Sequence, residues 1–131
     1  DASGCNPFIN ARIDTHSLLG DAERWMSETV LRARAYAEAG ADGILVLGAV
    51  SATALRALVG AVEVPVNVAL DATTLPVAEL AEAGAARISV GSAVAEAVHA
   101  ATLRMAQEVV NAGVATETAQ RLSWSRLNDL F

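Results

Sequence analysis

The stretch FINARID, residues 8–14, combines the apolar bulk of a buried strand with an arginine and an aspartate at its end. Because side chains alternate along a strand, Asn10, Arg12 and Asp14 share one face. The apolar residues of the other face are expected to pack against helices: Ile9, Ala11 and Ile13. Polar groups at the end of a strand are costly inside an open sheet but common at the mouth of a (β/α) barrel. The stretch therefore favours a barrel over a doubly wound sheet.

Elsewhere the chain repeats a junction between a helix and a strand. AEAGADGILV at 37–46 and AEAGAARISV at 81–90 each end a helix at a glycine, Gly40 or Gly84, and continue into a β-rich run. Strands are predicted at 8–13, 43–47, 65–70 and 87–91, alternating with helices at 22–39, 52–60, 76–83 and 93–111. This alternation predicts an α/β fold in which crossover helices connect parallel strands.

Three residues stand where helices are expected to begin. Ser51 and Ser92 occupy predicted N-cap positions, and Pro76 suits a first helical turn. At the other end of the chain, residues 114–131 are predicted to form a helical tail with two short helices, the second opened by Ser123. Several tail side chains are too apolar to remain in water: Leu122, Trp124, Leu127, Leu130 and Phe131.

Composition limits the class of protein. At 131 residues the chain is expected to be a single domain, and a hydrophobic fraction of 53% predicts a packed core. The net charge of -6 argues against nucleic acid or an anionic membrane as a partner. All nine cationic side chains are Arg, which excludes Lys-based covalent catalysis. With the single cysteine Cys5 and no apolar run long enough to span a bilayer, a cytoplasmic protein without a signal peptide is expected.

Polar residues also occur inside other predicted strands. Asn67 lies within PVNVALD, and Ser89 interrupts RISVG. Both could simply bond neighbouring backbone, and Arg12 could form a structural ion pair with Asp14 or another acid. His16 follows the first strand and is expected in a solvated loop, with the barrel mouth as the alternative.

FINARIDTH resembles a strand-five signature of the isocitrate lyase and phosphoenolpyruvate mutase superfamily, with Ile13 where a Thr is usual. The branch is described as phosphoenolpyruvate mutase-like or carboxyvinyl-carboxyphosphonate phosphorylmutase-like. RARAYAEAGADGILV, PVNV and RISVG are similar to the segments that form strands six to eight. The resemblance implies a (β/α)8 TIM barrel of which this chain covers the C-terminal half, strands five to eight. It also implies an enzyme that binds Mg2+ and cleaves or rearranges C–C or P–C bonds in small 2-oxo or enol carboxylates.

The resemblance assigns roles to particular residues. Arg12 would hold the carboxylate or phosphonate of the substrate and stabilise an enolate-like intermediate, which suits a planar guanidinium. Asn67 would contact a substrate carboxylate. Gly91 and Ser92, at the junction of strand eight and the next helix, would form an anion seat, although many relatives have Pro at the position of Ser92. Gly48 stands where relatives carry a His or Glu, which favours decarboxylation of a 2-oxo diacid or a 2,3-lyase reaction.

The resemblance also implies that the Mg2+ ligands lie on an N-terminal half, so no metal ligand is expected in this chain. Asp14 and Asp71 lie near the predicted mouth without paired-carboxylate spacing. We therefore expect an inactive half-barrel that binds substrate anions and pairs with an N-terminal half-barrel or a second copy, exchanging C-terminal helices between subunits. The alternative is a non-catalytic half-barrel assembly module.

Overall fold

The computed structural model describes residues 4–19, 22–48, 50–70 and 75–131. These residues form two compact units, 1–91 and 92–131, and the single unit that the sequence predicts for residues 1–131 stays a prediction. In chain order the elements are β1 (Asn10–Ile13), α1 (Thr15–Leu19), α2 (Ala22–Glu38), β2 (Gly43–Val46), α3 (Ala52–Ala61), β3 (Val66–Ala69), α4 (Val77–Glu82), β4 (Arg87–Ser89), α5 (Ala93–Ala112), the 3-10 helix η1 (Thr116–Gln120) and α6 (Trp124–Asn128).

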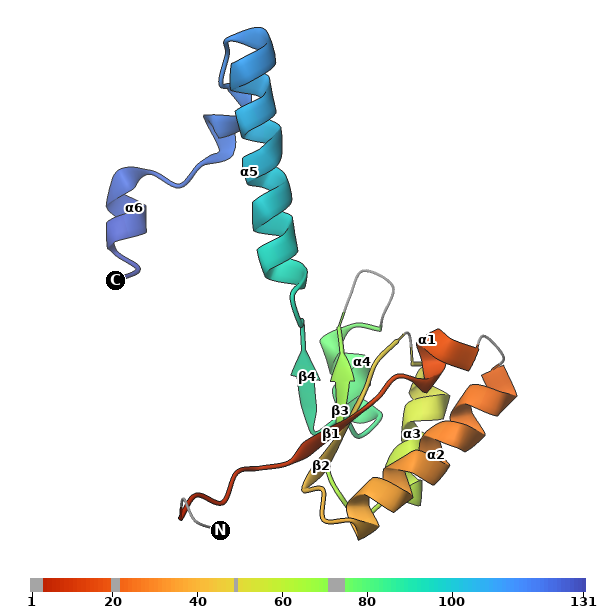
Figure 1. Cartoon of the computed structure of the whole chain (residues 1–131). Helices are drawn as coiled ribbons and strands as arrows, with labels where there is room; N and C mark the ends of the chain where they lie inside the picture. Colours follow the sequence, from red (N-terminus) through yellow and green to blue (C-terminus); the bar gives the residue numbers. More distant parts are fainter. Residues whose placement is uncertain (1–3, 20–21, 49, 71–74) are drawn as a thin grey trace. The chain divides into compact units, whose positions relative to one another are not determined.

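The first unit is built around a parallel sheet (Figure 1). Its strands lie in the order β1-β2-β3-β4, so every strand pairs with its neighbour in sequence. A helix lies in each connection between strands, as the alternation along the chain predicts. The predicted α/β class with parallel strands is confirmed, and each strand begins within two residues of its predicted start.

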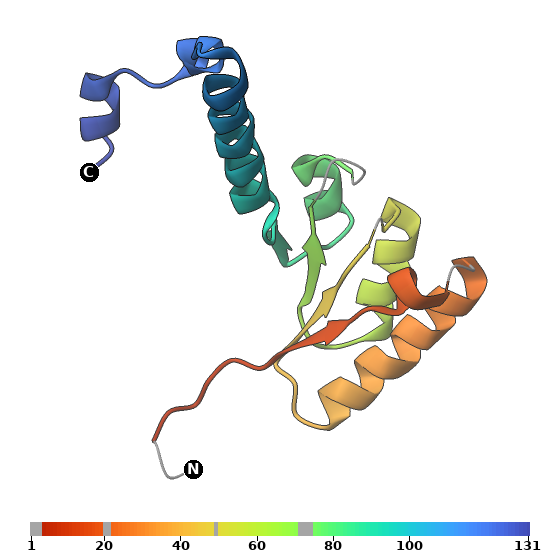
Figure 2. The same ribbon diagram turned by 45° about the horizontal axis from the view of Figure 1, so that its top comes forward.

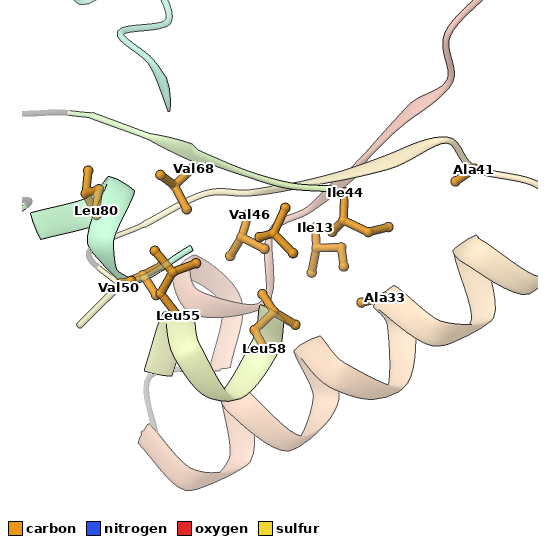
Figure 3. Packing of buried hydrophobic residues seen from close by; sticks show 12 residues of the cluster. Ile13, Ala33, Ala41, Ile44, Val46, Val50, Leu55, Leu58, Val68 and Leu80 are labelled. Atoms are coloured by element: carbon orange, nitrogen blue, oxygen red, sulfur yellow. The ribbon is translucent and has the colours of Figure 1, made fainter. Parts of the chain in front are cut away.

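One face of the sheet packs against helices. Figure 2 shows α2 and α3 side by side on this face, and Figure 3 shows apolar side chains filling the space between helices and strands. The strands and the helices α2 to α4 contribute these buried residues: Ile13, Ile44, Val46, Val66 and Val68 from the strands, and Ala33, Leu55, Leu58 and Leu80 from the helices. Because full burial of one aliphatic side chain stabilises the fold by about 1.5–3 kcal/mol, this face supplies most of the hydrophobic stabilisation of the unit.

The repeated helix ends have the predicted glycine geometry. Gly40 and Gly84 adopt φ of +99° and +100° after α2 and α4. In both junctions the amide after the glycine donates to a carbonyl five residues earlier: Ala41 to Tyr36 at 2.9 Å and Ala85 to Leu80 at 3.0 Å. Each junction therefore closes its helix in the same way and leads the chain into the next strand.

The observed helix starts agree less closely with the predicted ones. The Ser51 hydroxyl accepts a hydrogen bond from Ala54 N–H at 3.2 Å, so it caps α3 as predicted. Pro76 stands one residue before α4 in an extended conformation, with ψ of 150°, and not within the first helical turn. The difference is one residue, and the Pro76 carbonyl still accepts from Leu80 N–H at 3.1 Å.

Two expectations around β1 are wrong. Ile9 is exposed and does not pack on a helix, because the strand begins only at Asn10 and the Ile9 N–H donates to Asp42 Oδ2 at 2.8 Å. His16 is not in a solvated loop: it lies in the unpredicted helix α1 and is half-buried. The buried hydroxyls of Thr15 and Thr29 bond each other and tie α1 to α2, a contact that no local sequence pattern indicates.

The second unit consists of α5, η1 and α6. Gly113, with φ of +67°, ends α5, and Ser123 caps α6 by accepting from Arg126 N–H at 3.3 Å. Glu108 accepts hydrogen bonds from the Thr116 hydroxyl and, at 3.1 Å, from Glu117 N–H, which joins η1 to α5. None of the residues of α5 is buried. No helix in the described ranges combines the length and the apolar character that a membrane span requires.

Candidate functional site

The residues that the sequence selects on β1 and β3 share the face of the sheet turned away from the helices. Arg12 pairs in register with Leu45, and Leu45 pairs with Asn67. Residues in register on parallel strands point to the same side, and neighbouring strands lie about 4.8 Å apart. The backbones of Arg12 and Asn67 are therefore separated by two strand spacings, or about 10 Å. We refer to this side of the sheet as the inner face.

Arg12 forms an ion pair with Asp14 at the carboxyl end of β1. Its Nε lies 2.9 and 3.1 Å from the two Asp14 carboxylate oxygens, and its Nη2 lies 2.9 Å from Oδ1. The side chains are 61% and 38% exposed, respectively. This is the ion pair that the sequence left as an alternative, but exposed pairs contribute only about 0–1 kcal/mol. Asp14 occupies one edge of the guanidinium, and within the described residues no contact is shown for Nη1.

Asn67 is buried although it lies on the inner face. It is only 3% exposed, and its Nδ2 donates to Asn10 Oδ1 at 2.7 Å. Both amides line a hollow of about 540 Å3 at the amino ends of the strands, together with Phe8, Pro65, Ala86 and Arg87. Two residues near Asn67 were not selected from the sequence: Asn10, its hydrogen-bond partner, and Arg87, its register partner on β4. Asn10 lies two residues before Arg12, and Arg87 lies two residues before Ser89. Because side chains alternate along a strand, this spacing could have placed both residues on the same face as Asn67.

Gly91 and Ser92 lie at the junction between the two units. Gly91 adopts φ of +53°, and its N–H donates to Ser89 Oγ at 3.2 Å. The Ser92 hydroxyl does not cap α5; it donates to Glu96 Oε1 at 2.6 Å. A carboxylate next to Ser92 disfavours an anion there, and the anion seat predicted for this junction stays a prediction.

Gly48 lies just beyond the end of β2, in contact with the side chain of His16. With φ of +109° the position favours glycine, and a Cβ at Gly48 would lie 2.8 Å from the His16 Cβ and closer still to the ring atoms Cγ and Nδ1. The imidazole also contacts the ring of Trp25, with centroids 5.2 Å apart in an edge-to-face arrangement. The His16 ring thus fills the space that a side chain at position 48 would need.

The described residues do not fit a Mg2+ site. Among residues 4–19, 22–48, 50–70 and 75–131, no three His, Cys, Asp or Glu side chains gather where they could hold a metal ion. Asp14 is engaged by Arg12, and Asp71 lies outside the described residues. A hard divalent cation needs several converging oxygen ligands, and the described residues offer no such group.

Comparison with known proteins identifies the family. The family model described as phosphoenolpyruvate phosphomutase matches residues 1–110. An uncharacterized protein of Mycobacterium tuberculosis H37Rv is 41% identical over 85 residues, which are 65% of this chain and 32% of that protein. This chain thus matches about a third of that curated relative.

Solved structures agree with this match. A Burkholderia cenocepacia J2315 protein provisionally described as a lyase/mutase has a TM-score of 0.80 and 32% identity, covering 95% of this chain and 44% of its own. A second protein of that organism, provisionally described as a phosphonomutase, has a TM-score of 0.74 and 41% identity, covering 82% and 44%. Two more distant structures, 2,3-dimethylmalate lyase and oxaloacetate acetylhydrolase with its product oxalate, share the fold with TM-scores of 0.65 and 0.66.

The fraction of each solved structure that this chain covers accounts for the number of strands in its sheet. This chain spans less than half of each solved neighbour, and its four parallel strands correspond to about half of a (β/α)8 barrel, as predicted. The match to the family model covers residues 1–110, more than half of the 131 residues. The chain therefore belongs to the phosphoenolpyruvate phosphomutase family.

Proposed function

We propose that this chain is the substrate-anion-binding half of a lyase, decarboxylase or mutase acting on C–C or P–C bonds of small 2-oxo or enol carboxylates. The observation that carries the proposal is Arg12: its guanidinium stands exposed on the inner face at the carboxyl end of β1, oriented by Asp14. In a (β/α) barrel this end of the strands forms the active-site mouth. Because the exposed ion pair of this arginine contributes little to stability, we infer that its guanidinium serves to bind an anion.

Each selected residue has a role in this proposal. Arg12 holds the carboxylate or phosphonate through its free edge and stabilises the negative charge that develops on an enolate-like intermediate. Asn67 offers an uncharged amide to a second carboxylate, which requires exchange of its bond with Asn10. A role of Gly91 and Ser92 toward a further anionic oxygen would require the Gly91 N–H to leave Ser89 Oγ and the Glu96 carboxylate to move away from Ser92. Support for this substrate class comes from the family match and from the names of the neighbours, one of which holds oxalate.

Mg2+ belongs to the complete enzyme in this proposal, with its ligands outside this chain. The ion would supply Lewis-acid polarisation of a substrate oxygen. The chain itself contributes binding and orientation, and alone it is inactive, because Arg12 stands in water where its contacts with an anion are weak. Completion of the barrel removes that water and strengthens the same contacts.

The partners follow from the sheet. In the four-stranded sheet, β1 and β4 are edge strands with unpaired backbone groups, which favours pairing with an N-terminal half-barrel or a second copy. A cytoplasmic protein without a nucleic-acid or membrane partner fits this role. The same edges support the alternative, a non-catalytic half-barrel assembly module.

An activity assay separates the two functions. The chain is combined with the N-terminal half-barrel of the Burkholderia cenocepacia lyase/mutase, and C–C cleavage of oxaloacetate and P–C bond rearrangement of phosphonopyruvate are followed with and without Mg2+. We expect Mg2+-dependent turnover from the combination, none from the chain alone, and loss of most of it with Arg12→Lys. A stable combination that turns over neither compound would support the assembly module instead.

A further inference from the structure

His16 lies at the carboxyl ends of β1 and β2. It stands three residues after the end of β1, and its ring rests on Gly48, two residues after the end of β2. The two positions are complementary in size, because any Cβ at Gly48 would collide with the His16 side chain. Trp25 of α2 also packs against the imidazole, with its ring inclined by 71°. The half-buried ring is thus held by a strand end and a helix.

The connection from His16 back to Arg12 is short and fixed at several points. Thr15 is fully buried, and its hydroxyl bonds Thr29, so the residue before His16 cannot shift freely. Leu47 N–H donates to the Ile13 carbonyl at 3.2 Å, which joins the two strand ends just before Gly48. Asp14 lies between these anchors and binds the Arg12 guanidinium. Any movement of this turn would therefore move the carboxylate that orients Arg12.

We propose that His16 is a positioning residue for the Arg12 anion clamp: its ring, seated on Gly48 against Trp25, locks the turn between β1 and α1 and thereby fixes Asp14. The role rests on shape, because the ring fills the space next to Gly48 and lies against Trp25. That Arg12 holds the substrate anion is part of the proposed function, on which this inference rests for its consequence in catalysis.

The first experiment tests the lock without any ligand. Gly48→Ala introduces both a strained φ and a collision with His16, whereas the matched control Gly40→Ala introduces the strain alone, because nothing lies within 4 Å of a Cβ at Gly40. We expect Gly48→Ala to lower the folding equilibrium constant about tenfold more than Gly40→Ala. In the background of His16→Gly, which removes the His16 Cβ at 2.8 Å as well as the ring, Gly48→Ala should lose most of that excess. Equal effects of the two glycine substitutions would overturn the lock.

The second experiment follows Arg12 itself by NMR, using the Arg12 Nε–H resonance assigned by its loss in Arg12→Lys. We expect His16→Ala to shift this resonance and to speed its solvent exchange about fivefold or more, as the bond to Asp14 loosens. His16→Phe should leave both near the wild-type values, because it keeps a ring above Gly48. An unchanged resonance in His16→Ala, or a His16→Phe variant that behaves like His16→Ala, would overturn the positioning role.

A third arm separates this inference from the proposed function. Oxalate is titrated into four forms of the chain, each combined with the N-terminal half-barrel: the wild type, Arg12→Lys, His16→Ala and His16→Phe. The ring resonances of His99 in α5 serve as an internal reference. We expect His16→Ala to bind oxalate about three- to tenfold more weakly and His16→Phe to bind it as the wild type does. Oxalate binding that needs Arg12 but ignores His16 would refute this inference alone, whereas binding that ignores Arg12 would refute the proposed function and leave the lock standing.

Discussion

The two faces of the sheet differ in what their side chains do. Toward the helices, the strand residues Ile13, Ile44 and Val46 are buried in a continuous apolar core. On the inner face the register row contains two arginines, an asparagine and one half-buried leucine: Arg12, Leu45, Asn67 and Arg87. Hydrophobic burial on one face stabilises the fold, and polar groups on the other are available for binding. Stability and binding should therefore respond to different substitutions.

Neighbouring residues of β2 give the largest expected contrast. Ile44→Ala should lower the free energy of unfolding by about 2–5 kcal/mol, because it leaves a cavity in the core. Leu45→Ala should cost clearly less, about 1 kcal/mol, because this side chain faces the inner side and is already partly in water. Urea denaturation followed by circular dichroism measures both. Equal losses would break the distinction between the faces.

Asn67 is the exception that sharpens the comparison, since it lies on the inner face but is buried. Asn67→Ala should lower the free energy of unfolding by about 1–3 kcal/mol, because Asn10 Oδ1 loses its donor. The double variant Asn10→Ala with Asn67→Ala should cost less than the sum of the single changes. Additive losses in the same urea experiment would show that the two amides do not depend on each other.

The second unit, unlike the first, exposes apolar side chains that are not packed into a core. α5 has no buried residue, and large apolar side chains of the tail are exposed: Leu122, Trp124, Leu130 and Phe131. Deletion of residues 114–131 should lower the oligomeric state without changing the urea midpoint of the first unit. Light scattering measures the mass. An unchanged mass would refute the exchange of C-terminal helices between subunits.

The smallest expected effect concerns the turn between α5 and η1. The hydrogen bond from Thr116, followed by that from Glu117 N–H, lowers the pKa of Glu108. A lowered pKa means that the stabilisation is complete above the ordinary value of about 4.3 and is lost as the pH falls through the lower value in the folded state. We expect the Glu117 amide resonance to shift in that acid range. Thr116→Val should move the midpoint upward; an identical midpoint would contradict the assigned cause.

Much of the fold could be predicted because it depends on local signals. Gly40 and Gly84 mark helix ends, and the β-rich runs after them begin the strands where expected. The alternation in FINARID also placed Arg12 on the inner face correctly. The prediction that Ile9 packs against a helix was wrong because alternation does not show where a strand begins. In the structure the Ile9 N–H binds Asp42, and the strand starts at the next residue.

The site was less predictable, because its contacts join residues far apart in sequence. Asn67 and Asn10 are 57 residues apart, and no pattern within either strand shows that one amide binds the other. His16 and Gly48 likewise meet only once β1 and β2 pair. Sequence alternation gives the face of a side chain but not its partner.

The most direct test of the account compares the exposed ion pair of Arg12 with the part-buried ion pair of Arg32. Arg12 is bound by Asp14 on the inner face, and Arg32 is bound by Glu28, at 2.7 Å, on α2. Arg12→Lys and Arg32→Lys should each change the free energy of unfolding by less than about 1 kcal/mol. Calorimetric titration with oxalate, carried out on the chain combined with the N-terminal half-barrel, should show binding weakened about tenfold or more by Arg12→Lys and unaffected by Arg32→Lys. Absence of saturable oxalate binding to the wild type, or equal affinity of the two variants, would contradict the claim that Arg12 is the anion clamp.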